Sequence, residues 1–218
     1  MSIFKIHFFR CIDIQNAGDM ACGPYLYFDA FHNYPCVYHE LGHVDYDIAE
    51  DDVVILGASG LFGVSQQYAN NINILLNKCR NVIAWSVGHN DHNDHLDKVT
   101  NIQYEKFSIL TVRDWNYKEE RYVPCVTCML PGLSERHQIK RRIGVVEHVN
   151  YPIREFEYER ISNIFAVEFI LKFIGESEVI ITNSWHCVYW ATLMKKKVVL
   201  YNSFSNKFNY FKFPPVCY

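Results

Sequence analysis

Short continuous runs of apolar residues alternate along this chain with longer segments in which apolar and polar positions mix. The apolar runs predict strands at Phe4–Phe9, Val53–Leu56, Val82–Val87, Ser108–Val112, Ile143–His148, Val179–Thr182 and Val198–Tyr201. Continuous hydrophobicity is typical of parallel strands that are buried on both faces of a sheet. The mixed segments predict helices at Asp19–Phe31, Val64–Lys78, Ile161–Ile174 and Trp185–Met194. This alternation predicts an α/β fold built from doubly wound, Rossmann-type parallel sheets.

The alternation breaks at Val123–Arg142, where two prolines and a glycine precede a charged run. We therefore place a domain boundary in this segment, with an N-terminal Rossmann-like domain at residues 1–138 and a C-terminal one at residues 139–218. The second domain holds about three strand-like runs, which is few for an open α/β sheet. We therefore expect a short Rossmann-like domain that either is incomplete relative to its relatives or leans on the first domain.

Composition and charge narrow the class of protein. Half of the 218 residues are hydrophobic and 16% are aromatic, which supplies a substantial core. A formal net charge of −3 argues against nucleic-acid binding, which needs a basic surface. The N-terminal apolar stretch is too short and too charged to span a membrane, and it has no small-residue cleavage site. With eight scattered cysteines interpreted as reduced, buried thiols, these features predict a cytoplasmic protein without a transmembrane segment.

Candidate chemistry lies directly after the predicted strands, because open parallel sheets bind ligands beyond the carboxyl ends of their strands. Asn16 and Gly18 follow the first strand, and the adjacent Asp19 either caps a helix or binds a sugar hydroxyl. The second strand leads into a turn of small residues that lets the backbone approach a substrate closely. The candidates in this turn are Gly57, Ser59 and Gly60. Its spacing departs from the dinucleotide-binding fingerprint.

Two further strand ends carry basic or titratable side chains. His89 follows the Val82–Val87 strand by one glycine and is a candidate for acid–base work or for contact with a phosphate or carboxylate. His92 and His95 continue a three-residue spacing, but this run of Asn, Asp and His is typical of a hydrophilic loop, so we expect no metal site. Arg113 follows the next strand and either clamps an anion or pairs locally with Asp114.

The last block, Val179–Lys197, is the most informative segment. Its strand ends in polar residues that include Asn183 and Ser184, and a predicted helix carrying His186 begins there. The first amides of a helix lack partners within the helix, and the helix dipole is positive at this end. The arrangement therefore favours an anion. Elsewhere, Cys125 and Cys128 form a lone CxxC pair, for which we expect burial rather than zinc or redox chemistry.

Taken together, these segments resemble the polysaccharide pyruvyl transferase family. The matching pieces occur in the same order over nearly the whole chain: Asn16–Asp19, Val54–Gly63, Trp85–His89, Thr111–Asp114, Val123–Met129 and Ile181–Leu200. The resemblance implies a GT-B-like fold, in which two Rossmann-type domains face a cleft. It also implies transfer of a pyruvyl group from phosphoenolpyruvate to a sugar hydroxyl of a surface-polysaccharide precursor, forming a ketal. No metal or organic cofactor is expected, and the acceptor is a carbohydrate, free or lipid-linked.

The resemblance also assigns roles to residues. Arg113 and His186 would contact the carboxylate or phosphate of phosphoenolpyruvate, and His89 would lie at the same cleft. The vinyl carbon would be protonated while a sugar hydroxyl attacks, with His186, His89 or Asp19 as acid and base. Ser184 departs from the family, whose common form has an arginine at this position. The residues that could compensate for the missing charge are Arg113, Lys195 and Lys207.

This departure leaves two other functions open. One is a nucleotide-sugar glycosyltransferase of the same fold, which would bind a nucleotide diphosphate at the helix that begins at Ser184. The other is a non-catalytic binding subunit, which the missing arginine and the short second domain favour. The presence of His89, Arg113 and His186 argues for an active transferase.

Overall fold

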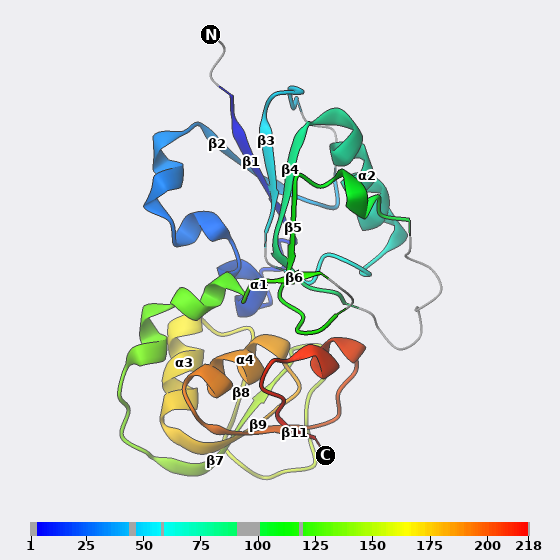
Figure 1. Cartoon of the computed structure of the whole chain (residues 1–218). Helices are drawn as coiled ribbons and strands as arrows, with labels where there is room; N and C mark the ends of the chain where they lie inside the picture. Colours follow the sequence, from blue (N-terminus) through cyan, green and yellow to red (C-terminus); the bar gives the residue numbers. More distant parts are fainter. Residues whose placement is uncertain (1–3, 44–46, 58, 91–100, 118–119, 218) are drawn as a thin grey trace. The chain divides into compact units, whose positions relative to one another are not determined.

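A computed structural model describes residues 4–43, 47–57, 59–90, 101–117 and 120–217 (Figure 1). The chain divides into two compact units, each formed from several segments. Unit 1 comprises Met1–Ile12, Cys22–Val126 and Ser205–Lys207, and unit 2 comprises Asp13–Ala21, Thr127–Phe204 and Phe208–Tyr218. The boundary predicted between residues 138 and 139 lies inside unit 2 of this division, because the turn that contains Gly132 packs against Leu171 of that unit.

The sheet of unit 1 is entirely parallel and has the order β2-β1-β3-β4-β5-β6 among the described residues. Its strands are β1 (Ile6–Arg10), β2 (Cys36–Glu40), β3 (Val53–Leu56), β4 (Asn81–Val87), β5 (Ile109–Val112) and β6 (Arg121–Tyr122). The sequence predicted four of them and missed β2 and β6. The strand order reverses between β1 and β3, so the carboxyl ends near this switch point are where such a sheet binds ligands.

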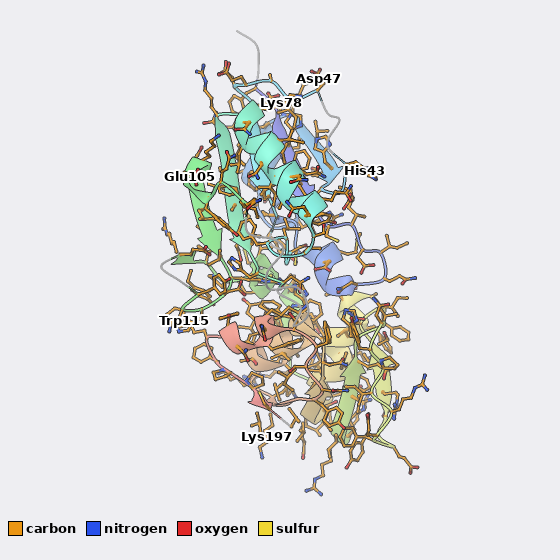
Figure 2. The ribbon with its side chains drawn as sticks, turned by 90° about the vertical axis from the view of Figure 1, so that its right-hand side faces the viewer. His43, Asp47, Lys78, Glu105, Trp115 and Lys197 are labelled. Carbon is orange, nitrogen blue, oxygen red and sulfur yellow. The ribbon has the colours of Figure 1, made fainter. Side chains whose placement is uncertain are left out.

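Helix α2 (Gln66–Lys78) matches the predicted helix and covers this sheet. Ser65 caps it, with the Ser65 hydroxyl accepting a hydrogen bond from the Tyr68 N–H at 3.2 Å. Its buried face, which includes Ile72 and Leu75, packs into the main core cluster of unit 1. Lys78 ends the helix and is exposed (Figure 2).

The predicted helix at Asp19–Phe31 is wrong. A short helix, α1 (Ala17–Ala21), ends before Gly23, and two 3₁₀ helices follow, η1 (Pro24–Leu26) and η2 (Asp29–Asn33). Pro24 explains the break, because proline lacks the N–H that would continue the helix and its ring collides with the preceding turn. The chain passes from unit 2 to unit 1 at the same place.

The sheet of unit 2 is also parallel, with the order β11-β10-β9-β7-β8 among the described residues. Its strands are β7 (Arg141–Glu147), β8 (Arg160–Ser162), β9 (Ser177–Thr182), β10 (Lys197–Leu200) and β11 (Val216–Cys217). The short strands β8 and β11 add to the three predicted strands, so the expectation of about three strands is wrong. The order again reverses beside the first strand, here between β7 and β9.

Among the described residues, α3 (Val167–Gly175) and α4 (Trp185–Leu193) pack against this sheet. Helix α4 matches its prediction, whereas α3 is shorter than predicted because β8 occupies the start of the predicted segment. Trp190 of α4 is fully buried, and its indole N–H donates to the Thr127 hydroxyl at 3.1 Å. The prediction of an α/β fold with Rossmann-type parallel sheets is confirmed. Within the part of the chain that the structure describes, no helix has both the length and the hydrophobicity that a bilayer crossing requires.

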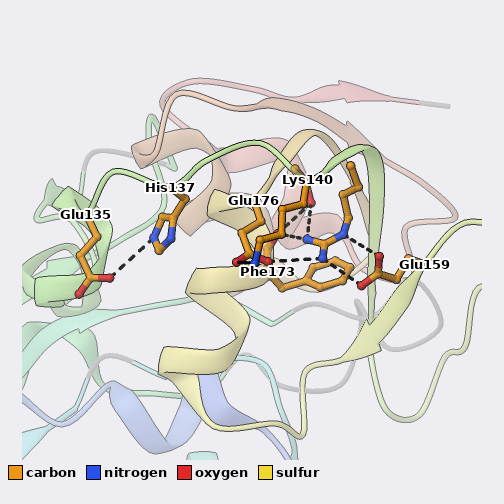
Figure 3. Close-up of polar contacts among 8 residues, drawn as sticks. Glu135, His137, Lys140, Glu159, Phe173 and Glu176 are labelled. Atoms are coloured by element: carbon orange, nitrogen blue, oxygen red, sulfur yellow. Dashed lines mark hydrogen bonds and ion pairs between the residues drawn. The ribbon is translucent and has the colours of Figure 1, made fainter.

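An ion-pair network joins the amino end of β7 to the segment that follows α3 (Figure 3). Arg141 forms a bidentate pair with Glu159, with both N···O distances 2.9 Å, and its guanidinium lies 4.2 Å from the centroid of the Phe173 ring. Glu176 accepts from Lys140 at 2.7 Å, and this hydrogen bond holds the pKa of the Glu176 carboxyl below its usual value. Because the network lies at the amino ends of the strands, it stabilises unit 2 and leaves the ligand-binding edge untouched.

Candidate functional site

In unit 1, the carboxyl ends of β3, β4 and β5 bring together residues that the sequence singled out. The turn after β3 is hydrogen-bonded to the segment after β4: the Gly88 N–H donates to Ser59 O at 2.9 Å, and the Phe62 N–H donates to Gly88 O at 3.1 Å. Arg113 follows β5 and donates its own N–H to Val87 O at 3.2 Å. We call the group formed by Ser59, Gly88, His89, Arg113 and Asp114 the Arg113 site.

Two glycines make room for the Arg113 side chain, which is only 5% exposed. A Cβ atom at Gly88 would lie 2.3 Å from Arg113 Nε, and one at Gly60 would lie 3.3 Å from Arg113 Nη2. The sequence predicted that Gly60 allows the backbone to approach a substrate, whereas the structure shows it accommodating this arginine. The small residues of the two turns therefore allow a guanidinium to be buried at the edge of the sheet.

The carboxylate of Asp114 holds His89 in place. The sequence indicated this carboxylate only as a local partner of Arg113. Asp114 Oδ2 accepts from the His89 N–H at 2.6 Å and lies 3.0 Å from His89 Nδ1. Asp114 is 1% exposed, so the surface Arg–Asp pair is not what this residue forms. Two bonds to one carboxylate oxygen fix both the backbone and the ring of His89, and they select the tautomer with the proton on Nδ1.

Two residues that the sequence analysis missed complete the surroundings of His89. Glu120 Oε2 lies 3.7 Å from His89 Nε2, and the Tyr117 ring stacks on the imidazole with a centroid distance of 3.7 Å. Both follow Asp114 in an irregular segment, and no pattern in the sequence marks them. They place His89 Nε2 in a polar, confined environment suited to proton transfer.

Several polar atoms of the Arg113 site are buried without a hydrogen bond. Ser59 Oγ, His89 Nε2 and Asp114 Oδ1 have no hydrogen-bond partner among the described residues. Leaving such an atom unpaired costs about 1–3 kcal/mol, so clusters of them are rare in folded proteins. A hydroxyl, an imidazole nitrogen and a carboxylate oxygen next to a guanidinium form a set that can bind an oxygen-rich ligand and exchange protons with it.

Lys207 also belongs to this region, although it is far away in the sequence. Its ammonium donates to Asn90 Oδ1 at 3.0 Å, and Asn90 lies beside Gly60. Of the compensating cations considered above, Lys207 thus lies near Arg113. Lys195 instead occupies an exposed turn after the carboxyl end of α4, so it cannot replace a charge at the amino end of that helix.

In unit 2, the first and last predicted blocks meet. A Cβ atom at Gly18 would lie 2.0 Å from His186 Nδ1, so the imidazole packs directly on the backbone of α1. Asn16 stabilises this turn, because its Oδ1 accepts from the Gly18 N–H at 3.2 Å and its Nδ2 donates to Asp19 Oδ2 at 2.8 Å. Asn16 therefore caps the helix, so of the two roles considered for Asp19 the structure does not support the capping one. We call Asn16, Gly18, Asp19 and His186 the His186 site.

The residues before His186 are placed as the strand-to-helix pattern predicted. Ser184 precedes α4 as its N-cap residue, but its side chain makes no capping hydrogen bond. Asn183 has a structural role: its Oδ1 accepts from the His148 N–H at 2.8 Å, and its Nδ2 donates to Tyr151 O at 2.7 Å. Burial raises the pKa of the neighbouring Cys187 thiol to about 12.

The remaining predicted residues are placed as follows. Gly57 donates its N–H to Phe9 O at 2.8 Å, and a Cβ atom there would meet nothing closer than 3.6 Å. Cys125, which precedes the 3₁₀ helix η4 (Val126–Met129), is buried as expected, whereas Cys128, inside that helix, is exposed, so the expected burial of this cysteine is wrong. His92 and His95 lie outside the described residues.

Comparison with known proteins shows the fold alone. No family model matches the sequence, and no curated protein matches it. A solved structure of a functionally uncharacterized protein from Klebsiella pneumoniae subsp. pneumoniae is similar, with a TM-score of 0.56 and 16% sequence identity. The match covers 91% of this chain and 83% of the other.

Proposed function

We propose that this chain is a transferase that acts on carbohydrate with an anionic donor, and specifically that it transfers a pyruvyl group from phosphoenolpyruvate to a sugar hydroxyl. The observation that carries the proposal is the buried guanidinium of Arg113, which two glycines accommodate at the carboxyl edge of the unit 1 sheet. A planar guanidinium binds a carboxylate or phosphate through two parallel hydrogen bonds. The GT-B-like arrangement and the surface-polysaccharide acceptor remain part of this proposal through the resemblance.

The reaction needs a proton donor, a proton acceptor and stabilisation of negative charge. A proton adds to the CH₂ carbon of phosphoenolpyruvate while one sugar hydroxyl adds to the neighbouring carbon. A second hydroxyl then displaces phosphate, and the ketal is complete. In this proposal Arg113 holds the carboxylate or the departing phosphate, and His89, positioned by Asp114, moves a proton through Nε2. His186 keeps the acid–base role that the resemblance implies.

The proposal is tested by calorimetric titration of phosphoenolpyruvate into the wild-type chain and into two variants. Arg113→Lys keeps the charge but loses the fork, and we expect it to weaken binding about tenfold, as expected for one lost charge-assisted hydrogen bond. Arg80→Lys is the matched control, because Arg80 pairs with Glu50 on the surface of the same unit and both side chains are more than 60% exposed. Its affinity for phosphoenolpyruvate should equal that of the wild type.

The opposite outcomes separate the competing functions. Heat evolved with nucleotide sugars but not with phosphoenolpyruvate would replace this proposal with a glycosyltransferase. The absence of binding heat with both classes of donor would favour a non-catalytic protein.

A further inference from the structure

A buried asparagine that the sequence analysis did not select lies at the carboxyl edge of the unit 2 sheet. Asn163 directly follows β8 and is 2% exposed. Its backbone N–H donates to Glu147 O at 2.9 Å, and its backbone carbonyl accepts from the Ala17 N–H at 2.9 Å. Its side-chain Oδ1 accepts from the Val149 N–H at 2.8 Å. Asn163 thus joins the end of β7, the loop after it and the start of α1.

The orientation of this amide follows from its partner. The Val149 N–H can only donate, so the oxygen of the Asn163 side chain has to face it and the nitrogen has to point the other way. Asn163 Nδ2 is buried and has no hydrogen-bond partner among the described residues. Asn183 follows β9, on the other side of β7, and holds the same loop through both ends of its amide. Both ends of the Asn183 amide are therefore hydrogen-bonded within the fold, whereas the Nδ2 donor of Asn163 is not.

The surroundings of Asn163 belong to the His186 site. Its carbonyl holds Ala17, and the next residue, Gly18, is the one that packs on His186. The elements that Asn163 joins carry two carboxylates and one guanidinium: Asp19 accepts from Asn16, Glu147 accepts from the Ile153 N–H at 2.9 Å, and Arg160 of β8 lies 3.9 Å from the Glu147 carboxylate. A sugar hydroxyl can accept from this amide and donate to a carboxylate at the same time, which a fully deprotonated phosphate cannot.

We propose that Nδ2 of Asn163 donates a hydrogen bond to a hydroxyl oxygen of the carbohydrate acceptor, which makes Asn163 an acceptor-binding residue. This inference rests on the proposed function, because it takes the carbohydrate acceptor from there. It adds a binding residue to the His186 site. A buried donor that the fold leaves unpaired gains a hydrogen bond when the carbohydrate binds. Only a ligand that places an oxygen opposite Nδ2 gains this binding free energy.

The test uses Asn163→Asp, which has the same shape, keeps the oxygen that accepts from Val149 and replaces the donor with an acceptor. Binding of methyl glycosides of glucose, galactose and mannose is measured by saturation-transfer NMR with the whole chain. We expect the signals of the glycosides that bind the wild type to fall about tenfold in the variant, as for the loss of one buried hydrogen bond. Asn150→Asp adds the same charge at an exposed position of the same loop and should leave the signals unchanged.

A second measurement avoids variants altogether. The side-chain NH₂ resonances of Asn163 in ¹⁵N-labelled wild-type protein should shift when a binding glycoside is added. Glycoside binding that persists in Asn163→Asp, or resonances that stay in place, would overturn the inference. Calorimetry with phosphoenolpyruvate on the same samples separates the two proposals, because a failure of donor binding refutes the proposed function while the glycoside results still decide the role of Asn163.

Discussion

Replacing Gly18 with alanine tests the packing that brings the first and last sequence blocks together. The added Cβ would lie 2.0 Å from His186 Nδ1, 2.3 Å from its Cγ and 2.7 Å from its Cβ, whereas real contacts of a Cβ atom stay above 3.0 Å. Rotation of the imidazole can relieve the first two contacts. It cannot relieve the third, because the Cβ of His186 is fixed to the backbone of α4. One of the two helices therefore has to move.

Overpacking of this kind costs about 1–3 kcal/mol, so we expect Gly18→Ala to lower the free energy of unfolding by that amount. For a chain of this size, each kcal/mol corresponds to a decrease of roughly 2–4 °C in Tm. Gly57→Ala is the matched control, since its Cβ would meet no atom closer than 3.6 Å. Its stability should stay at or slightly above that of the wild type, because alanine reduces the entropy of the unfolded chain.

The assay is urea denaturation followed by circular dichroism, extended to the double variant Gly18→Ala/His186→Ala. Removing the imidazole takes away the two shortest contacts and leaves the one at 2.7 Å, so the double variant should recover part of the lost stability. Equal stability of Gly18→Ala and the wild type, or strict additivity of the two substitutions, would refute the packing of His186 on α1.

Two further predictions concern the histidines of unit 1. Asp114→Asn should lower the rate of phosphate release from phosphoenolpyruvate about a hundredfold, because it disturbs the alignment of His89. Asp29→Asn, in an exposed pair with His32, should leave this rate unchanged. Similar losses of rate in both variants would contradict the role of Asp114. Burial and the neighbouring His7 lower the pKa of His39 to about 4. Between about pH 6.5 and 4, therefore, His39 is protonated in the unfolded chain but neutral in the folded one. The free energy of unfolding should fall by about 3 kcal/mol as the pH is lowered through this window. Urea titrations of His39→Gln at several pH values should show a weaker pH dependence; an unchanged dependence would count against this account.

Much of the fold could be predicted from the sequence, because β-branched runs that are buried on both faces are unambiguous. The runs at Val53–Leu56 and Val179–Thr182 became strands with almost the predicted bounds. The strands that were missed, β2, β6, β8 and β11, are half-exposed or very short, so their residues carry no continuous hydrophobic pattern. β8 was also hidden because Ile161 continues the apolar periodicity of the helix that follows.

The candidate site could be predicted only in part. Residues directly after strands, such as His89 and Arg113, were found because the carboxyl edge of a parallel sheet is fixed by the chain direction. Asp114 was seen as a partner for the adjacent Arg113, and its hydrogen bonds to His89 depend on the order of the strands. Glu120 follows no pattern, because it lies in an irregular segment and its contact with His89 is a tertiary one. Asn163 directly follows β8 and was missed because that strand was not predicted.

The central claim is that the Arg113 site binds phosphoenolpyruvate for transfer to a sugar, and ³¹P NMR tests it most directly. Phosphoenolpyruvate is incubated with the wild-type chain, Arg113→Lys and Arg80→Lys, with and without the three methyl glycosides. The account predicts conversion to inorganic phosphate that requires a glycoside, is preserved in Arg80→Lys and is strongly reduced in Arg113→Lys. Equal phosphate release by all three proteins, or a phosphoenolpyruvate signal that stays unchanged with the wild type and every glycoside, would contradict it.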